Sequence, residues 1–517
     1  MPVVTGIIAG ATAVAQAGIA AIGAVGGALG IGGGIGGFLT VARVVIGIAS
    51  IGYSFVQQSM ARQKQKKQQR LEALAGGATT GEAALQTITA PIITQRMVYG
   101  TVRTGGGTFF FEDIPPYRIV GLALAAHEVD GFDEVTINGN VLVLDAAGFA
   151  TNAPYTRPDG RQLLRVSLRK GTVNQAVDPI IIQRARWVGP SFRQQETATI
   201  VVEANYGNSD TEYQEVWPGG ALEIVVKVRG KKVFDPTDPS QSLTDPSTWK
   251  WSDSPSLCCA DFMTWDDKFG VKLKKQRLDL VKLAQSASID REMVITRTGQ
   301  YERRYTVNGV IDTDISGEDA IRSFLTANRG RISDQNGQIG IIAGRYTDPV
   351  MTIHQGLLTG GFSYRAGLPR KDAINLLRTR FVDPARQYQV SDGPVLESAA
   401  RQIRDGGVYE TTLEFALVEG SSRVQRLGKA AFEDAELGRV IKNPVSMACF
   451  RLESGDNIQI DFPDAPHCNG VYSVESVELN KDLSGVSLTL VETGPQIYAF
   501  NPTIDDKPFA FEVITRT

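Results

Sequence analysis

The sequence predicts a mainly β protein with α+β parts, organised in several domains and preceded by an apolar, glycine-rich N-terminal segment. Its 517 residues, 42% of them hydrophobic, are enough to form several hydrophobic cores. The first charged residue is Arg43, so the segment before it suits apolar surroundings. Beyond residue 90, short alternating segments separated by turn residues are typical of β-strands with one buried face.

The charge and the cysteines exclude several classes of protein. The formal net charge is −3, from 53 basic and 56 acidic residues, so no broad positive surface is available to hold nucleic acid tightly. The cysteines at 258, 259, 449 and 468 have neither the density of a disulfide framework nor the paired spacing of a zinc site. We therefore expect a reducing compartment and no tight binding of DNA or RNA.

The apolar N-terminal segment spans residues 1–61. The stretches 6–27 and 36–56 are each long enough to cross a bilayer as a helix. Glycines that recur every four residues would leave bare backbone on one helix face and allow close self-association. Two interpretations stay open: the segment enters a membrane, or it packs inside an assembly and never meets lipid. The residues assigned to this membrane or lumen segment are Gly26, Gly30, Gly34, Gly36, Phe38, Val45, Ile46 and Phe55.

A basic cluster follows at the start of a polar linker, residues 62–90. The cluster could contact anionic lipid headgroups beside an inserted helix, or it could belong to a solvated helical stalk. Its members are Arg62, Lys64, Lys66, Lys67 and Arg70.

Strand signals dominate the rest of the chain. Residues 134–144 alternate apolar and polar side chains around Asn138-Gly139, a dipeptide that tolerates the positive φ angles of a two-residue hairpin turn. Residues 222–228 and 486–490 alternate in the same way. These patterns predict sheets with one buried and one solvated face.

Two helices are predicted. Residues 317–328 carry apolar side chains on one face, with Ser316 capping the start and Gly330 ending the helix. The second helix covers about 424–437.

Changes in composition predict the domain boundaries. The proline-rich residues 235–256 suit neither a helix nor a central strand, and residues 360–369 are glycine-rich and contain a proline near their end. The predicted division is a β-rich part over 91–250 with room for an insertion at about 150–215, an α+β domain over 251–365, and a C-terminal β domain over 366–517.

No catalytic, cofactor-binding or metal site is predicted, so we expect the chain not to be an enzyme. Residues 312–317 begin like a calcium loop, but Ser323 stands where a bidentate glutamate is required, which favours a helix-capping turn. His467 and Cys468 are expected to be neighbours in a strand, where their side chains point to opposite faces and cannot share a proton.

A series of motifs between residues 91 and 390 follows the order of a known family. The first is Pro91-Ile-Ile-Thr-Gln-Arg-Met-Val-Tyr-Gly-Thr-Val-Arg-Thr-Gly-Gly106, with Val-Tyr-Gly, an arginine and a glycine pair before an aromatic strand. The others lie at 228–236, 252–263, 305–313, 340–344 and 381–384. In this order and spacing the chain resembles the tip attachment protein J family, the central tail hub proteins of lambda-like siphophages.

The resemblance implies a multidomain phage tail hub at the distal tip of the virion. It implies a homotrimer that closes the tail tube, docks on the distal tail protein ring, meets the tape measure protein and opens for DNA ejection, with DNA only passing through. Receptor-binding or fibre proteins would be separate chains. The N-terminal segment would then plug the channel and could enter the host membrane.

Two other functions are considered. One is a membrane-active, pore-forming protein whose β-rich body recognises a target. The other is a tail-associated cell-wall hydrolase, which requires at least one essential Asp, Glu or Cys.

Overall fold

The computed structural model describes residues 94–508, except 208, 218–219, 221, 266–269, 336, 368–372, 387 and 481–483. Within these residues strands outnumber helices, and they form several separate sheets. The predicted fold class, mainly β with α+β parts, is therefore confirmed for the described part of the chain. No helix in that part is both long and apolar enough to cross a membrane.

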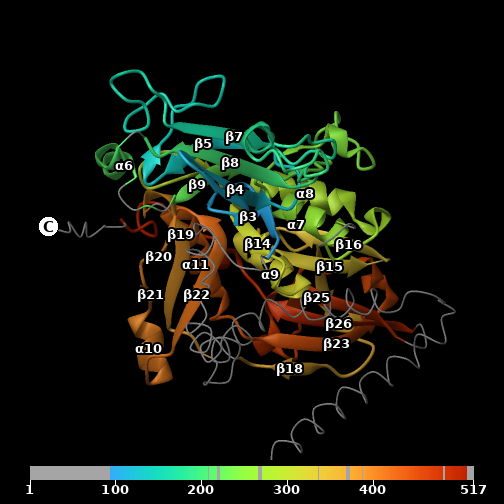
Figure 1. Cartoon of the computed structure of the whole chain (residues 1–517). Coiled ribbons are helices and arrows are strands. Elements are labelled where there is room, and N and C mark those ends of the chain that lie inside the picture. The colour runs from blue at the N-terminus through green and yellow to red at the C-terminus, as the bar shows by residue number, and fades with distance from the viewer. Residues whose placement is uncertain are drawn as a thin grey trace, which may run out of the picture. The chain divides into compact units, whose positions relative to one another are not determined.

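Two four-stranded sheets near the start of the described chain share one hydrophobic core. Figure 1 shows strands from distant parts of the sequence side by side in this sandwich. Val102, Val135 and Val226 enter the core from one sheet, and Leu122 and Val202 enter from the other. The strand order of the first sheet is β2 (Thr101–Thr104), β9 (Ile224–Arg229), β5 (Gly131–Ile137) and β6 (Asn140–Val141). The strand order of the second sheet is β3 (Gly107–Ile114), β4 (Tyr117–Ala125), β8 (Ala198–Asn205) and β7 (Leu164–Arg169).

The predicted hairpin is confirmed in this sandwich. Strands β5 and β6 pair directly across Asn138 and Gly139, which have φ angles of 48° and 78°. Both residues are left-handed, as a two-residue turn requires. Two short helices, α5 (Pro179–Arg184) and α6 (Asp210–Val216), belong to the same region.

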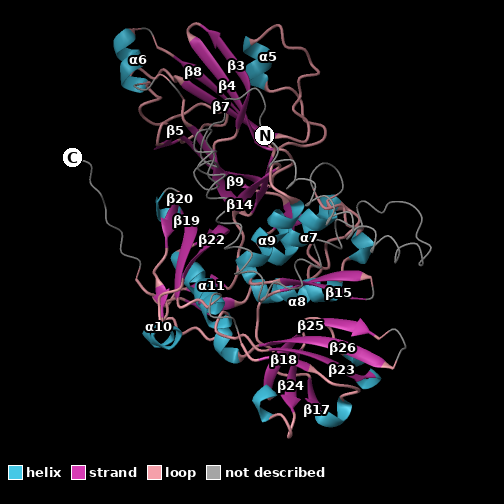
Figure 2. Ribbon diagram, turned by 90° about the horizontal axis from the view of Figure 1, so that it is seen from below, coloured by secondary structure: helices cyan, strands magenta, loops and turns pink. Residues whose placement is uncertain are grey.

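Three helices form the α+β part that follows. Figure 2 shows α7 (Pro255–Thr264), α8 (Leu280–Asp290) and α9 (Gly317–Asn328) grouped beside the hairpin of β15 (Arg331–Gln335) and β16 (Gln338–Ile342). The pairing of β1 (Arg96–Tyr99) with β14 (Gly309–Asp312) joins the start of the described chain to this part. The remaining strand pairs are β10 (Lys232–Val233) with β11 (Lys250–Trp251), and β12 (Met293–Ile295) with β13 (Tyr301–Arg303).

Helix α9 has the bounds that its pattern predicts. The Ser316 hydroxyl accepts a hydrogen bond from the Asp319 amide at 3.1 Å, which confirms the predicted cap. The helix ends at Asn328, as predicted, but the residue in the left-handed conformation after it is Arg329, with φ 50° and ψ 33°, and not the expected Gly330.

The C-terminal half contains two further sheets. In the first, β19 (Leu376–Asp383) pairs in parallel with β22 (Glu410–Glu419) and antiparallel with both β20 (Gln389–Asp392) and β21 (Leu396–Glu397). Helix α11 (Ser421–Asp434) packs on this sheet. Helix α10 (Ala399–Asp405) lies between β21 and β22 in sequence. Helix α11 starts three residues before the predicted position because the chain turns at Gly420, which has a φ of 91°.

The second C-terminal sheet has six strands. Its order is β17 (Met351–His354), β24 (Asn457–Asp461), β25 (Gly470–Leu479), β26 (Gly485–Glu492), β23 (Val440–Ser446) and β18 (Ser363–Arg365). It therefore contains strands from both sides of the boundary predicted near residue 365, and β18 lies inside the predicted glycine-rich junction. That division of the chain into domains stays a prediction.

Candidate functional site

The site residues that the sequence analysis selects all lie outside the described residues. This holds for the membrane or lumen segment and for the basic cluster that follows it, Arg62, Lys64, Lys66, Lys67 and Arg70.

A cavity of about 150 Å³ lies where the α+β part and the two C-terminal sheets meet. Its wall includes α9, the β15–β16 hairpin, α11, and strands β22, β25 and β26. Apolar side chains contribute much of the surface, among them Leu325, Ile342, Phe415, Leu427 and Ile497. We refer to it as the junction cavity.

Two arginines at the junction cavity tie its walls together. Arg329, in the turn that ends α9, donates from Nη2 to Asp434 Oδ2 of α11 at 2.9 Å. Arg331, at the start of β15, donates from Nη1 to Ser473 Oγ of β25 at 2.7 Å and from Nη2 to the Gly455 carbonyl at 2.6 Å. Gly455 has a φ of 107°, and a Cβ there would lie 2.5 Å from the Ile342 side chain. The close approach of this loop therefore depends on glycine.

Burial changes the acidity of the groups around the junction cavity. It raises the pKa of Asp434, while the charge and hydrogen bond of Arg329 act in the opposite direction. Burial also raises the pKa of Glu475 and lowers that of the Arg331 guanidinium. The polar groups of the cavity wall thus join α9 and β15 to α11 and β25.

A second, smaller crevice of about 70 Å³ lies between the first sandwich and strand β22. Arg103 of β2, Gly309 of β14, Tyr388 and Glu419 are among its lining residues. Burial raises the pKa of Glu419 to about 8, while Arg423 and Lys227 act to lower it. Glu419 is therefore a carboxyl group that is largely protonated at neutral pH, at a contact between two parts of the chain.

The region that begins like a calcium loop contains a structural ion pair. Asp312 lies 3.4 Å from Arg96 of the paired strand β1, and Ser316 caps α9. No group of three or more His, Cys, Asp or Glu side chains in the described residues is arranged to hold a metal ion.

The prediction that His467 and Cys468 lie in a strand is wrong. They lie in a 3-10 turn, Pro466–Cys468, because Pro466 cannot donate to a sheet. Cys468 is buried, and the ring of His467 makes an edge contact with Tyr364 at 5.2 Å between centroids.

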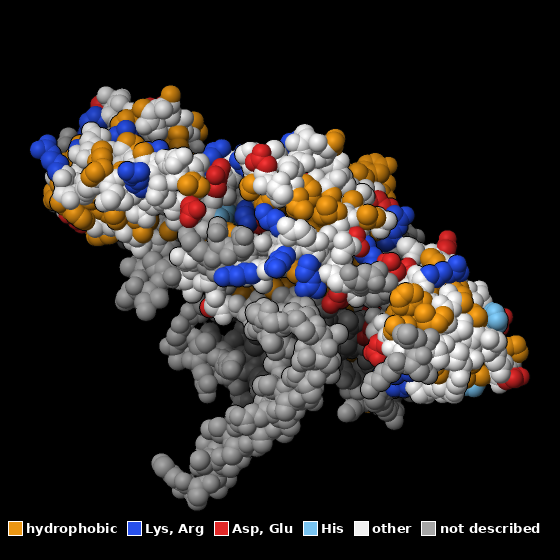
Figure 3. All heavy atoms as spheres, turned by 90° about the vertical axis from the view of Figure 1, so that its right-hand side faces the viewer, with side chains coloured by type: hydrophobic (Ala, Val, Ile, Leu, Met, Phe, Trp, Pro, Cys, Tyr) orange, Lys and Arg blue, Asp and Glu red, His pale blue; other side chains and the backbone are white. Residues whose placement is uncertain are grey.

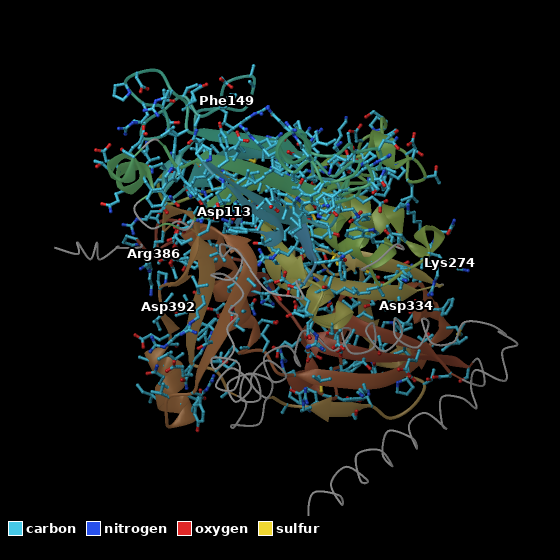
Figure 4. All side chains as sticks on the ribbon, viewed as in Figure 1. Asp113, Phe149, Lys274, Asp334, Arg386 and Asp392 are labelled. Carbon is cyan, nitrogen blue, oxygen red and sulfur yellow. The ribbon has the colours of Figure 1, made fainter. Side chains whose placement is uncertain are left out.

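The lysines that follow α7, among them the exposed Lys272 and Lys274, belong to a solvated surface of mixed charge. Lys274 and Asp334, both exposed, are labelled on the same side of the chain in Figure 4. That side faces the viewer in Figure 3, where basic side chains gather in the middle and acidic ones lie among them. Neighbouring opposite charges reduce the field available to attract a polyanion.

The chain was compared with known proteins. No family model and no curated protein matches it. Among solved structures, a chain from the "virion of native gene transfer agent (GTA) particle" matches with a TM-score of 0.54 and 15% identity, covering 94% of this chain and 98% of that one. This similarity shows a shared fold.

Two further solved structures match less well. A tail protein from Neisseria meningitidis MC58 gives a TM-score of 0.30 at 10% identity, covering 78% of this chain and 98% of that one. A 43 kDa tail protein of prophage MuSo2 from Shewanella oneidensis gives 0.27 at 10% identity, covering 76% and 92%.

Proposed function

We propose that the chain is a structural protein of a phage or phage-like tail. The observation that carries this proposal is the fold shared with a chain of a gene transfer agent virion, over nearly the whole length of both chains. The junction cavity supports it, because its arginines and carboxylates are used in contacts between parts of the same chain and not in a catalytic arrangement.

Within the tail, the chain is proposed to be the hub at the distal tip. The motifs that resemble the tip attachment protein J family support this more specific role, and each of them falls on a regular element of the described chain. These elements are β1, β9 with β10, α7, β14, β16 and β19. In this role three copies close the tail tube, contact the distal tail ring and the tape measure protein, and open for DNA ejection.

The N-terminal segment, residues 1–61, is proposed to plug the channel and to enter the host membrane during ejection. Its length without charge and its glycine spacing support this role. The test is flotation with vesicles of phosphatidylethanolamine and phosphatidylglycerol: the full chain is expected to float, and the chain without residues 1–61 is not. Equal flotation of both chains would exclude membrane insertion by this segment.

The tail role is tested on particles. A copy of the chain with an epitope tag at its C-terminus, expressed while particles are produced, is expected to co-purify with them through a density gradient. Gold-labelled antibody to the tag is expected at the tail end distant from the head. Particles without the chain would contradict the tail role, and label distributed along the tail would contradict the tip position. Lysis of cells, or cleavage of purified peptidoglycan, by the chain alone would favour the pore-forming or hydrolase alternative.

A further inference from the structure

An exposed stretch on the first sandwich combines a tryptophan with two arginines that no carboxylate balances. We call Ile182, Arg186, Trp187, Pro190 and Arg193 the Trp187 surface. All five side chains are exposed, and they come from α5 and the loop that follows it.

A small hydrophobic core holds the Trp187 surface in place. Ile180 and Ile181 of α5 are buried against Phe110 and the outer face of the β3–β4–β8 sheet. The ring of Trp187 stacks on Phe110 with 6.2 Å between centroids, and Phe192 contacts Phe110 at 6.0 Å.

Two polar contacts fix α5 to the same sheet. Arg184 pairs with Glu203 of β8 at 2.5 Å, and its guanidinium lies 3.7 Å from the centre of the Tyr117 ring. Arg165 of β7 donates to the side chain of Gln183 at 3.0 Å and also lies over Phe149, which is labelled in Figure 4. The surface therefore has a defined shape before any partner binds, which reduces the entropy lost on binding.

Trp187 is unusually exposed. Its side chain is 70% accessible, and it is the one exposed residue among the five tryptophans, all of which are described. Ile182, five residues earlier in α5, is 49% accessible. A large indole on a braced surface offers much apolar area to a partner at little cost in side-chain entropy.

The charge of the Trp187 surface is entirely positive. Residues 179–195 contain no Asp or Glu, and the acidic partner of Arg184 comes from β8. Neither Arg186 nor Arg193 has a carboxylate within ion-pair distance among the described residues, and the Arg193 guanidinium donates to the Pro190 carbonyl, three residues earlier, at 3.0 Å. A complementary surface must therefore supply the negative charge.

We propose that the Trp187 surface docks onto another protein of the particle, one that offers an apolar recess bordered by Asp or Glu side chains. The inference rests on the proposed tail function. Tryptophan and arginine are the residues most enriched at the energetic centres of protein interfaces. Two arginines give only weak attraction to an anionic membrane or to a phosphate backbone, so the combination fits a protein better than either of these.

The docking is tested by photo-crosslinking in particles. Trp187 is replaced in the full chain by p-benzoylphenylalanine, and Ile504, which is 70% accessible, is replaced in a matched control. After irradiation, position 187 is expected to join to a different protein of the particle, at a peptide that contains Asp or Glu. Position 504 is expected not to join to that peptide. The inference is overturned by a crosslink from position 187 to a second copy of this chain, to lipid or to nucleic acid, or by no crosslink at all.

A charge variant tests the recognition. The double variant Arg186→Gln, Arg193→Gln is expected to reduce recovery of the crosslinked partner at least tenfold at low ionic strength. At high salt the difference between the variant and wild type is expected to become small, because salt screens the exposed arginine charges of the wild-type chain. Unchanged recovery would contradict the role of charge. Circular dichroism melts matching wild type would show that the fold is intact.

Absence of the wild-type chain from particles would contradict the tail function itself, whereas incorporation without a crosslink would contradict only the docking.

Discussion

Burial perturbs three carboxyl groups at the places where separate parts of the chain meet. Asp434 and Glu475 lie at the junction cavity, and Glu419 lies at the crevice between the sandwich and β22. In each case burial is the largest cause of a raised pKa. Asp434 has Arg329 as a direct partner, whereas nearby cations only partly offset the burial of Glu419. Because its pKa is raised to about 8, the charge state of Glu419 changes near neutral pH.

Glu419→Gln is expected to stabilise the chain at high pH and not at low pH. The folded pKa of about 8 is raised from 4.5, so Glu419 contributes stability that is complete below pH 4.5 and is lost as the pH rises through 8. Glutamine resembles the protonated form and cannot ionise, so the gain should be near zero at pH 5 and roughly 1–3 kcal/mol at pH 9. Urea unfolding at both pH values measures this difference.

The control for this change is Glu414→Gln, at an exposed glutamate on the same strand. An equal effect of Glu419→Gln at pH 5 and pH 9, or the same pH dependence in the control, would mean that Glu419 is not the titrating group.

At the level of elements, local signals predicted local structure well. The Asn138-Gly139 hairpin and helix α9 were predictable because the turn dipeptide and the serine cap act through neighbouring residues. Strands β17 and β18 were not predicted. Each has three or four residues, too few to show alternation, and each pairs with a strand distant in sequence, as Met351 does with Ile458.

The candidate site was not predictable for the same reason. Arg329 and Arg331 are close in sequence, but their partners Asp434 and Ser473 come from two other parts of the chain. From the sequence alone, a single arginine near a helix end cannot be distinguished from an ordinary solvated residue. The residues that the sequence does single out lie before the described part of the chain, so those predictions stay predictions.

Two glycines with left-handed φ angles allow turn geometry to be separated from packing. Gly139 has a φ of 78°, and a Cβ there would meet nothing within 4 Å. Gly100 has a φ of 68°, but its Cβ would lie 2.0 Å from the Val307 carbonyl oxygen. Gly139→Ala is expected to cost about 1 kcal/mol from backbone strain alone, and Gly100→Ala about 3 kcal/mol or more, because backbone must move. Thermal unfolding of both variants measures the difference. Equal losses would show that steric contact at Gly100 is relieved without cost.

At the scale of the whole described chain, the sheets join segments that are far apart in sequence. Residues 351–365 supply both edges of the six-stranded sheet, and the rest of that sheet comes from residues 440–492. Strand β1 likewise pairs with β14 across more than 200 residues, since Arg96 lies opposite Asp312. Dividing the chain into consecutive segments at about residues 250 and 365 therefore separates strands that pair with each other, at both places.

Ile353→Ala tests which unit residues 351–365 belong to. Ile353 is fully buried in the core of the six-stranded sheet, so its truncation is expected to cost about 2–5 kcal/mol. If the segment is part of the C-terminal unit, hydrogen exchange should accelerate in β24 and β25 and stay unchanged in α9 and β15, because local stability follows the packed unit. The matched control is Val350→Ala, three residues earlier, at a side chain that is 58% exposed, where little change is expected. Equal acceleration in α9 would instead assign residues 351–365 to the α+β domain, as the predicted boundary near 365 requires.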